Sequence, residues 1–519
     1  MSNTTKTNLL NKSKTFFSVD LRFFLICCIS GAFWGTSAPG YDLWLLAWIG
    51  LSPLLIIIAL DNSPRKAFIY SLGFGFFYNL VYLGWFAGLF PLRWLGLNDF
   101  LAVLLIIFVL IVIPIYQAIV IGLFGTAYSY ILKLKSGKII LTPLLWVLIF
   151  EILNSLGPLA LPWAMVQYSQ YQLPTMVQVC DIIGGTGIGY IVILNNTAYA
   201  LFLLDWIKSD KKNEQQQMSL LKKHSFILGF IALLLFTINI YGYKKLLKTH
   251  YKGEFNACIT QAAIPVEFYR TGKISTKEQL AVYLNLLKYC PDGVIVFPEG
   301  AVSTTLRDDF NFAKLFLLKL SAEAKKSTII TGTYDRIGEE ETNAVIAINS
   351  GFPDDDKMSV YHKRHLVPFG EYTPFREFLP EPLEKLASIS STRDFAQGKN
   401  PLLLNTTFGK AGCFICYEVV FPFMAKEMVS KGAEFLVNVS NLGWFHNSII
   451  DKQFISMCSM RAIENNRYFI VSINNGSSAI ISPTGEILAL TPKNETSYFS
   501  AKIDTIRSLT FYTKWNFFQ

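Results

Sequence analysis

The chain falls into two halves that differ in the spacing of their hydrophobic positions. Up to about residue 247, long apolar blocks alternate with short polar connections. From about Phe255, short apolar runs alternate with stretches in which apolar residues recur every three or four positions. Long apolar blocks are typical of membrane helices, and the second pattern is typical of strands that alternate with helices. We therefore expect a transmembrane helical domain over 1–247, an α/β domain over 248–498 and a C-terminal tail over 499–519.

Seven apolar blocks are candidate membrane spans, which makes a multi-pass α-helical bundle the expected architecture of the first half. A composition of 52% hydrophobic and only 16% charged residues supports a membrane protein with a polar domain attached. Because a span needs roughly 20 residues of helix, some blocks are short, and the fourth is long enough to need tilt or a kink at Pro114. The blocks are 23–35, 43–60, 67–89, 100–132, 139–156, 184–207 and 226–240.

Basic residues lie almost entirely on one side of these spans. Fourteen lysines and arginines precede the first span or follow the second, fourth and sixth, whereas the opposite connections offer only Arg93. Because Lys and Arg near span ends resist translocation, we expect the N-terminus in the cytoplasm. An odd number of spans then exports the second half of the chain to the outer side of the membrane. The net charge of +9 reflects this topology, so we expect a lipid bilayer and no nucleic acid as partner.

The second half has the length and rhythm of an α/β domain with its own core. Ser275 and Thr276, with Glu278 close behind, are typical of a helix start. We expect helices over 275–289, 310–325 and 449–465. The expected strands are 257–262, 294–297, 328–331, 344–348, 413–416, 435–439, 469–473 and 479–481.

The eight cysteines do not have the spacing of a disulfide framework. Two of them, Cys27 and Cys28, lie in the first apolar block, and the others are scattered along the chain. We therefore expect free thiols, which an exported location permits, and one of them is expected to be reactive.

Three short segments of the second half each carry an ionisable residue in a setting that favours chemistry. Glu299 follows Phe297-Pro298 where a buried strand ends, which is where α/β sites form, although a solvated loop glutamate is the alternative. Lys363 lies in a basic run that could also be a surface patch or a lipid head-group contact. An apolar turn follows it and ends in a second carboxylate, Glu371. After Cys416 come Tyr417 and Glu418, which argue against a buried inert thiol because an apolar strand interior would not continue with an acid. A base, a cation and a thiol together suffice for acyl transfer.

Other chemistries fit the sequence less well. Cys413 and Cys416 form a CxxC, but residues three apart on a strand point to opposite faces, which disfavours a shared metal or disulfide. His362, His365 and His446 have no acidic neighbour in sequence that would complete a metal site, so we expect none. The chain contains neither the G-x-S-x-G of a serine hydrolase nor a phosphate-cradling glycine loop.

The second half resembles the carbon-nitrogen hydrolase (nitrilase) superfamily, and the full length resembles the bacterial apolipoprotein N-acyltransferases. The resemblance implies a four-layer αββα sandwich, with Glu299 as base, Lys363 as oxyanion cation and Cys416 as nucleophile. Around that site, Glu371, Tyr417, Glu418 and Trp444 match residues that the family uses, and Trp163 belongs to a matching motif of the membrane half. The matching motifs are Pro162-Trp163, Gln167 to Gln170, Phe297 to Glu299, Lys363 to Glu371, Ile415 to Glu418, Ser440-Asn441, Trp444-Phe445, Met460 to Ala462 with Glu464, and Asn474 to Gly476.

The resemblance also implies a reaction. A phospholipid would acylate Cys416, and the resulting thioester would react with the free α-amino group of a diacylglyceryl-cysteine at the start of a lipoprotein, in ping-pong order and without a cofactor. Two alternatives stay open: a membrane-anchored amidase that uses the same residues with water as acceptor, and a non-enzymatic protein with a degenerate domain.

The sequence departs from the family pattern in three places. Leu442-Gly443 stand where the family usually has an acidic residue, and Phe268 and Tyr269 stand near the position of a usual tryptophan. Family members normally end with another membrane helix, whereas the aromatic tail of this chain suits the membrane interface.

Overall fold

The computed structural model describes residues 19–209, 214–248, 252–270, 272–303, 326–349, 359–378 and 394–515, together with 305, 306, 320 and 380. The chain forms two compact units, which are described separately. The first comprises Met1–Gly84, Phe108–Ser155 and Gly189–Leu233, and the second comprises Trp85–Ile107, Leu156–Ile188 and Leu234–Gln519. The predicted helix over 310–325 lies outside the described residues, apart from Leu320.

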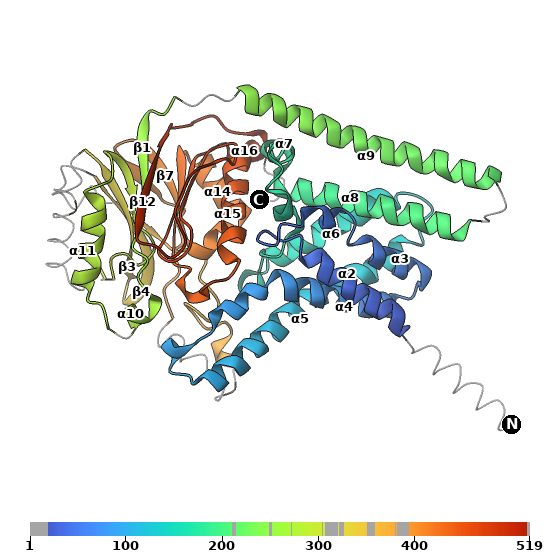
Figure 1. Cartoon of the computed structure of the whole chain (residues 1–519), viewed down its shortest axis with the longest axis horizontal. Coiled ribbons are helices and arrows are strands. Elements are labelled where there is room, and N and C mark those ends of the chain that lie inside the picture. Colours follow the sequence, from blue (N-terminus) through green and yellow to red (C-terminus); the bar gives the residue numbers. More distant parts are fainter. Residues whose placement is uncertain are drawn as a thin grey trace. The chain divides into compact units, whose positions relative to one another are not determined.

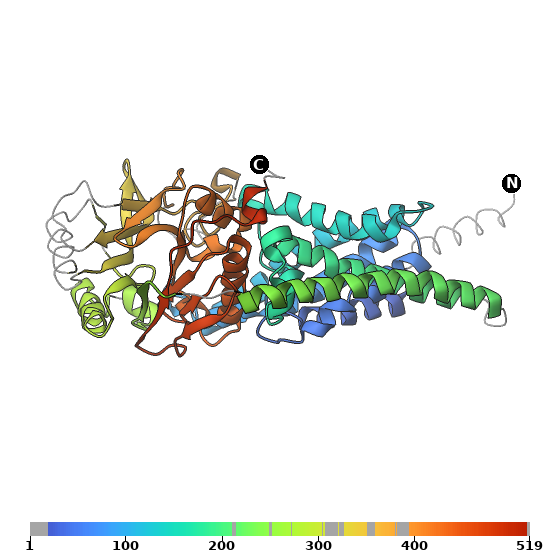
Figure 2. The ribbon, with the colours of Figure 1, turned by 90° about the horizontal axis from the view of Figure 1, so that it is seen from above.

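The first unit is helical, and each predicted apolar block contains a helix. Figure 2 shows α9 as one long continuous helix. The block 43–60 differs from the expected single span, because it divides into a short 3₁₀ helix and α3. The helices of the membrane half are α2 (Leu21–Gly35), η1 (Trp44–Trp48), α3 (Ser52–Leu60), α4 (Pro64–Tyr82), α5 (Asp99–Ile131), α6 (Lys138–Asn154), α8 (Cys180–Lys208) and α9 (Glu214–Lys248).

Close backbone approach and one buried amide hold these helices together. A Cβ on Gly31 of α2 would lie 2.1 Å from the carbonyl oxygen of Phe74 in α4, so only glycine permits this contact. Where the block 43–60 is broken, the Asn196 side chain donates to Ala47 O at 2.9 Å and accepts from Leu51 N at 3.0 Å. These bonds satisfy backbone groups that an apolar environment would otherwise leave without partners.

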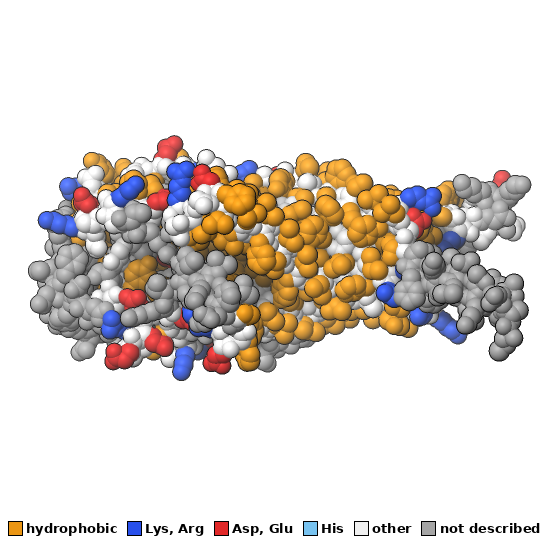
Figure 3. Space-filling model, turned by 90° about the horizontal axis from the view of Figure 1, so that it is seen from below, with side chains coloured by type: hydrophobic (Ala, Val, Ile, Leu, Met, Phe, Trp, Pro, Cys, Tyr) orange, Lys and Arg blue, Asp and Glu red, His pale blue; other side chains and the backbone are white. Residues whose placement is uncertain are grey.

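Three helices in the described part of the chain are long and apolar enough to cross a membrane: α5, α8 and α9, with mean hydropathies of 3.0, 1.6 and 2.0. The α5 helix is continuous through Pro114, whereas α8 is interrupted at Gly184, whose φ is 67°. Hydrophobic side chains gather over the helical region on the face shown in Figure 3, as expected for contact with lipid. The count of seven crossings stays a prediction.

The second half of the chain folds into the predicted α/β domain, which contains two six-stranded sheets. The strand order is β12-β1-β2-β3-β4-β5 in one sheet and β11-β10-β9-β8-β7-β6 in the other. In the first sheet the strands are β1 (Phe255–Gln261), β2 (Gly293–Val296), β3 (Thr328–Ile337), β4 (Glu340–Asn349), β5 (Ser359–His362) and β12 (Ser497–Ile503). In the second they are β6 (Leu403–Thr406), β7 (Gly409–Ile415), β8 (Phe435–Ser440), β9 (Phe469–Ile473), β10 (Ala479–Ile481) and β11 (Ile487–Leu490).

Helices cover the outer faces of the paired sheets, which gives the αββα order (Figure 1). The α11 helix (Thr276–Leu287) packs on the first sheet and begins where predicted, with a capping box formed by Ser275 and Glu278. The α14 (Pro422–Ser430) and α15 (Ile450–Asn465) helices cover the second sheet. Between the sheets, Ser472 Oγ donates to Thr260 O at 3.0 Å. The predicted nitrilase-type sandwich is confirmed.

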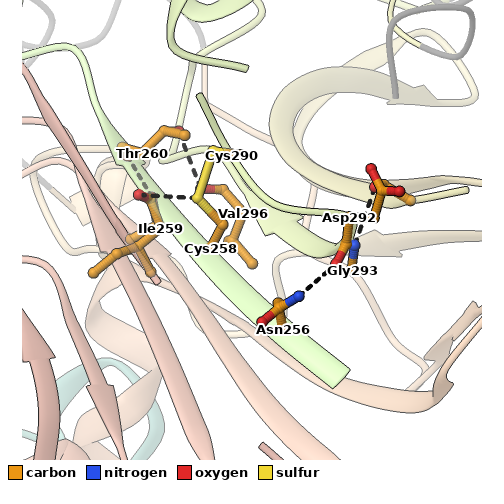
Figure 4. Close-up of a disulfide and its surroundings, with 10 residues drawn as sticks. Asn256, Cys258, Ile259, Thr260, Cys290, Asp292, Gly293 and Val296 are labelled. Carbon is orange, nitrogen blue, oxygen red and sulfur yellow. Dashed lines mark hydrogen bonds between the residues drawn. A yellow bond between two sulfur atoms is a disulfide. The ribbon is translucent and has the colours of Figure 1, made fainter. Parts of the chain in front are cut away.

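Two features of the domain differ from what the sequence suggested. Strand β12 runs across the predicted boundary at 498 and pairs with β1 from Phe255 to Gln261, so the sheet extends to Ile503. The expectation of free cysteines is wrong for one pair, because Cys258 on β1 and Cys290 after α11 form a disulfide, with their Cα atoms 6.0 Å apart (Figure 4). The other six cysteines are free.

Candidate active site

The three predicted reactive residues follow the ends of strands in both sheets. Glu299 comes three residues after β2 ends, Lys363 comes directly after β5, and Cys416 comes directly after β7. The Lys363 backbone is held by two hydrogen bonds, one from its N–H to Asn343 O at 2.9 Å and one from Gly398 N to its carbonyl oxygen at 2.7 Å. The strand ends thus bring together groups that lie far apart in the sequence.

A buried cluster of charges surrounds Lys363, whose side chain is 1% exposed. Its Nζ lies 2.8 Å from Glu371 Oε1 and 3.7 Å from Glu299 Oε1. Glu371 therefore contacts the lysine directly. The Asn441 backbone N–H donates to the other oxygen of Glu299 at 3.0 Å.

Asn343, which the sequence analysis did not single out, bridges the two carboxylates. Its Nδ2 donates to Glu299 Oε1 at 2.7 Å and to Glu371 Oε1 at 3.1 Å. The residue lies on β4 immediately before the run Ala344 to Ile348, whose residues are buried. A polar residue next to a buried strand core is a signal that could have identified it.

Cys416 occupies a strained turn. The strand ends at Ile415, one residue earlier than predicted, and Cys416 begins the 3₁₀ helix η8 (Cys416–Val420) with a φ of 50°. This left-handed conformation costs a non-glycine residue about 1–3 kcal/mol and is concentrated at functional sites. Asn438 Nδ2 on β8 donates to Cys416 O at 3.2 Å and so supports the turn. Cys416 is partly exposed, whereas the other free cysteines are buried.

Burial and neighbouring charges set the protonation states of the cluster. Burial raises the pKa of Cys416 to about 12, with a further increase from Glu299 that Lys363 opposes, so the resting thiol keeps its proton. Burial also raises the pKa of Glu299, although Lys363 opposes the shift. For Lys363, burial disfavours the charge, but the carboxylates of Glu371 and Glu299 outweigh burial and raise its pKa. The arrangement pairs a neutral thiol with a permanent cation and a carboxylate whose proton affinity is increased.

The aromatic residues predicted around the site lie within the same compact unit. The ring of Tyr417 stacks on Trp163 with centroids 6.5 Å apart, and its hydroxyl donates to Ala160 O at 3.1 Å. Trp163 Nε1 in turn donates to Gln453 Oε1 at 2.7 Å. Trp444 lies in the 3₁₀ helix η9 (Gly443–Phe445), just after Asn441.

Glu418, the last of the predicted supporting residues, is completely buried. Its carboxylate accepts hydrogen bonds from the Ile415, Arg364 and His365 backbone N–H groups. It therefore contacts both the lysine segment and the cysteine turn.

The three histidines considered as metal ligands lie in three different settings. His362 Nε2 is 2.8 Å from Asp335 Oδ2, the His365 ring stacks on Phe421, and His446 Nε2 is 3.9 Å from Glu267. Among the residues that the structure describes, no group of three or more His, Cys, Asp or Glu side chains could hold a metal ion.

Two family models match the chain. The carbon-nitrogen hydrolase model matches residues 278–510, and the apolipoprotein N-acyltransferase N-terminal domain model matches residues 30–198. Among solved structures, Nit3 of Saccharomyces cerevisiae, a member of branch 10 of the nitrilase superfamily, is 19% identical with a TM-score of 0.36. That likeness covers 49% of this chain and 91% of Nit3.

Curated relatives match almost the full length. The apolipoprotein N-acyltransferase of Geobacter metallireducens is 28% identical over 517 residues, which cover 96% of this chain and 93% of the relative. That of Rickettsia typhi is 29% identical over 496 residues, which cover 92% and 91%. With both domain models in order along one chain, and with the sandwich fold observed, the chain belongs to the apolipoprotein N-acyltransferase family of acyltransferases.

Proposed function

We propose that the protein transfers a fatty acyl chain from a phospholipid to the N-terminal α-amino group of diacylglyceryl-cysteine in a lipoprotein. The observation that carries the proposal is the buried cluster of Glu299, Lys363 and Glu371 together with a cysteine in a strained turn. The curated relatives, which bear the name apolipoprotein N-acyltransferase, support the choice of acceptor.

In the first half-reaction, Cys416 Sγ attacks the ester carbonyl of the phospholipid. Because its pKa is raised to about 12, the thiol must lose its proton during the attack, and Glu299 accepts that proton. Negative charge develops on the carbonyl oxygen, where the Lys363 ammonium and the Tyr417 backbone N–H stabilise it. Such a donor is typically worth about 3 kcal/mol. Collapse breaks the ester C–O bond, lysophospholipid leaves with the proton from Glu299, and the acyl chain stays on sulfur.

In the second half-reaction, the α-amino group attacks the thioester carbonyl. Glu299 takes a proton from the attacking nitrogen and returns it to the departing sulfur, so the amide forms and the free thiol is restored. A glutamate with a raised pKa suits this role, because it must both accept and release a proton near neutral pH. Glu371 and Asn343 keep Lys363 and Glu299 in place throughout.

We further propose that the α/β domain lies on the outer side of the inner membrane. The excess of basic residues in the connections on one side of the predicted spans favours this orientation. The disulfide between Cys258 and Cys290 supports it independently, since disulfides persist in oxidising compartments. Both substrates are membrane lipids, which gives a physical reason for joining an acyltransferase domain to membrane helices.

Mass spectrometry of the purified protein after incubation with phospholipid tests the proposal. We expect an acyl adduct on the peptide that contains Cys416, lost in Cys416→Ser and retained in Cys413→Ser, which removes the neighbouring buried thiol. The adduct should persist in buffer and discharge when a diacylated lipopeptide is added. Rapid discharge to water without an amine would instead favour the amidase, and full function of Cys416→Ser in cells would exclude catalysis through this thiol.

A further inference from the structure

Glu418 forms a hydrogen-bonded junction that the proposed mechanism does not use. Its side chain is 0% exposed, and both of its oxygens accept hydrogen bonds. One donor is a side chain, Tyr361, whose hydroxyl lies 2.9 Å from Oε1 and 3.0 Å from Oε2. The backbone donors are Arg364 N at 2.6 Å and His365 N at 3.0 Å to Oε1, and Ile415 N at 2.8 Å to Oε2.

These donors flank the two residues that must meet in the reaction. Arg364 directly follows Lys363, Tyr361 precedes it by two positions on β5, and Ile415 directly precedes Cys416. One carboxylate therefore connects the segment that carries the cation to the turn that carries the thiol. The connection is made at residues adjacent to the reacting groups, where a small displacement changes their separation most directly.

We propose that Tyr361 is a positioning residue, which holds the Glu418 carboxylate in the orientation that sets the distance between the Lys363 ammonium and the Cys416 thiol. The inference deepens the proposed function and rests on it for the roles of Lys363 and Cys416. Tyr361 itself touches neither substrate nor sulfur in this scheme.

The chemistry of the pair suits this role. Burial raises the pKa of Tyr361, and the neighbouring Glu418 carboxylate raises it further, so the hydroxyl remains a donor. Since Tyr361 is also 0% exposed, water does not reach the bond from the surface. Without that hydroxyl, a buried carboxylate loses one of its donors and is free to rotate toward its remaining backbone partners, which belong to two different segments.

The test compares Tyr361→Phe with a matched control, Tyr468→Phe. Tyr468 is an equally buried tyrosine of the same domain, and its hydroxyl makes a 3.4 Å contact with Asp504 instead of Glu418. Two rates are measured in the full-length protein: acylation of Cys416 by phospholipid, and alkylation of Cys416 by iodoacetamide as a function of pH, both followed by mass spectrometry of the Cys416 peptide. Thermal unfolding of each variant is recorded alongside.

For Tyr361→Phe we expect acylation to slow roughly tenfold, since a hydrogen bond to an ionised group is typically worth about that factor. We also expect the alkylation profile to move to higher pH, because a displaced Lys363 stabilises the thiolate less. Glu299, Lys363 and Glu371 are the charges that face this thiol. Tyr468→Phe should leave both rates unchanged.

A purely structural role for Tyr361 would lower the unfolding temperature without moving the alkylation profile, and that result would overturn the inference. Glu418→Gln provides a second variant, because its amide keeps the shape of the side chain but one of its two acceptors becomes a donor. If Tyr361 and Glu418 act as one unit, Tyr361→Phe should slow acylation clearly less in the Glu418→Gln background than in the wild type. Additive effects of the two substitutions on the acylation rate would contradict the inference. Failure of the wild type to form an acyl adduct would count against the proposed function, whereas alkylation tests the positioning role without any lipid.

Discussion

Asn343→Asp is the sharpest perturbation of the charge cluster, because it changes a donor into an acceptor at nearly constant volume. In the wild type, Nδ2 donates to Glu299 Oε1 at 2.7 Å and to Glu371 Oε1 at 3.1 Å. The substitution puts a third carboxylate at hydrogen-bond distance from two others, beside the single positive charge of Lys363. All three cannot be ionised together in a buried site.

The magnitude follows from the shorter distance. Two unit charges about 2.7 Å apart repel by about 6 kcal/mol at an effective dielectric constant of about 20, which is several times the 1.36 kcal/mol of one pKa unit. One proton is therefore shared within the cluster at neutral pH, and Glu299 loses its capacity to accept another. We expect acylation of Cys416 at pH 7 to fall by about 100-fold or more and to recover in part as the pH rises and the shared proton leaves.

The assay is the rate of acyl-adduct formation on the Cys416 peptide between pH 6 and pH 9. Asn256→Asp is the matched control, since Asn256 lies in the same domain and its Nδ2 donates to Asp292 O at 3.0 Å on the exposed side. A wild-type rate and pH profile for Asn343→Asp would refute the reasoning, because it would mean that proton uptake by Glu299 does not limit the attack.

Three further predictions concern the cation, the disulfide and an acid-sensitive histidine. Lys363→Met should slow acylation of Cys416 about 100-fold or more, because the oxyanion and the thiolate both lose their cation. Lys363→Arg should not restore the rate, because its planar guanidinium has a different shape. The rate of adduct formation, followed by mass spectrometry, is measured for both variants. Cys290→Ser should lower the unfolding free energy by about 2–4 kcal/mol, because the disulfide closes a sequence separation of 32 residues, and a reductant should do the same in the wild type. Calorimetry checks this, with Cys413→Ser as control. An unchanged unfolding transition in Cys290→Ser would contradict the prediction. Burial and Arg364 lower the pKa of His365 from 6.5 to about 4, so its contribution to stability is complete above pH 6.5 and is lost as the pH falls toward 4. In His365→Gln, the loss of unfolding free energy between pH 6.5 and pH 4 should be smaller than in the wild type by up to about 3 kcal/mol, as measured by thermal unfolding. An equal pH dependence of stability in both proteins would argue against it.

The strands that were predicted and those that were missed differ in where they lie in the sheets. All eight predicted strands correspond to strands of the structure, from β1 to β4 and from β7 to β10. The four missed ones, β5, β6, β11 and β12, are the four edges of the two sheets. Edge strands have one neighbour and are partly exposed, so they lack the continuous apolar run by which a buried strand is found.

The residues of the candidate site also divide into those that local sequence features identify and those that only the fold identifies. Glu299, Lys363 and Cys416 each stand at the end of an apolar run or before an apolar turn, a local feature that can be read without knowing the fold. Asn343 and Tyr361 act through hydrogen bonds to residues 28 to 57 positions away. The position of Asn343 beside an apolar run marks it as a polar residue next to a buried strand, but does not show which carboxylates it meets.

The sequence by itself determined the membrane half, the α/β half and the three candidate reactive residues, because hydrophobic periodicity and side-chain chemistry are properties of short segments. Only the tertiary structure decided which groups meet: the Cys258 and Cys290 sulfurs, the two carboxylates on Asn343, and the backbone donors on Glu418. The physical cause of these contacts is the pairing of strands and sheets, which brings segments that are distant in sequence within hydrogen-bond distance. The same pairing buries the Lys363 ammonium beside the carboxylates of Glu299 and Glu371, where charges interact more strongly than they would in water.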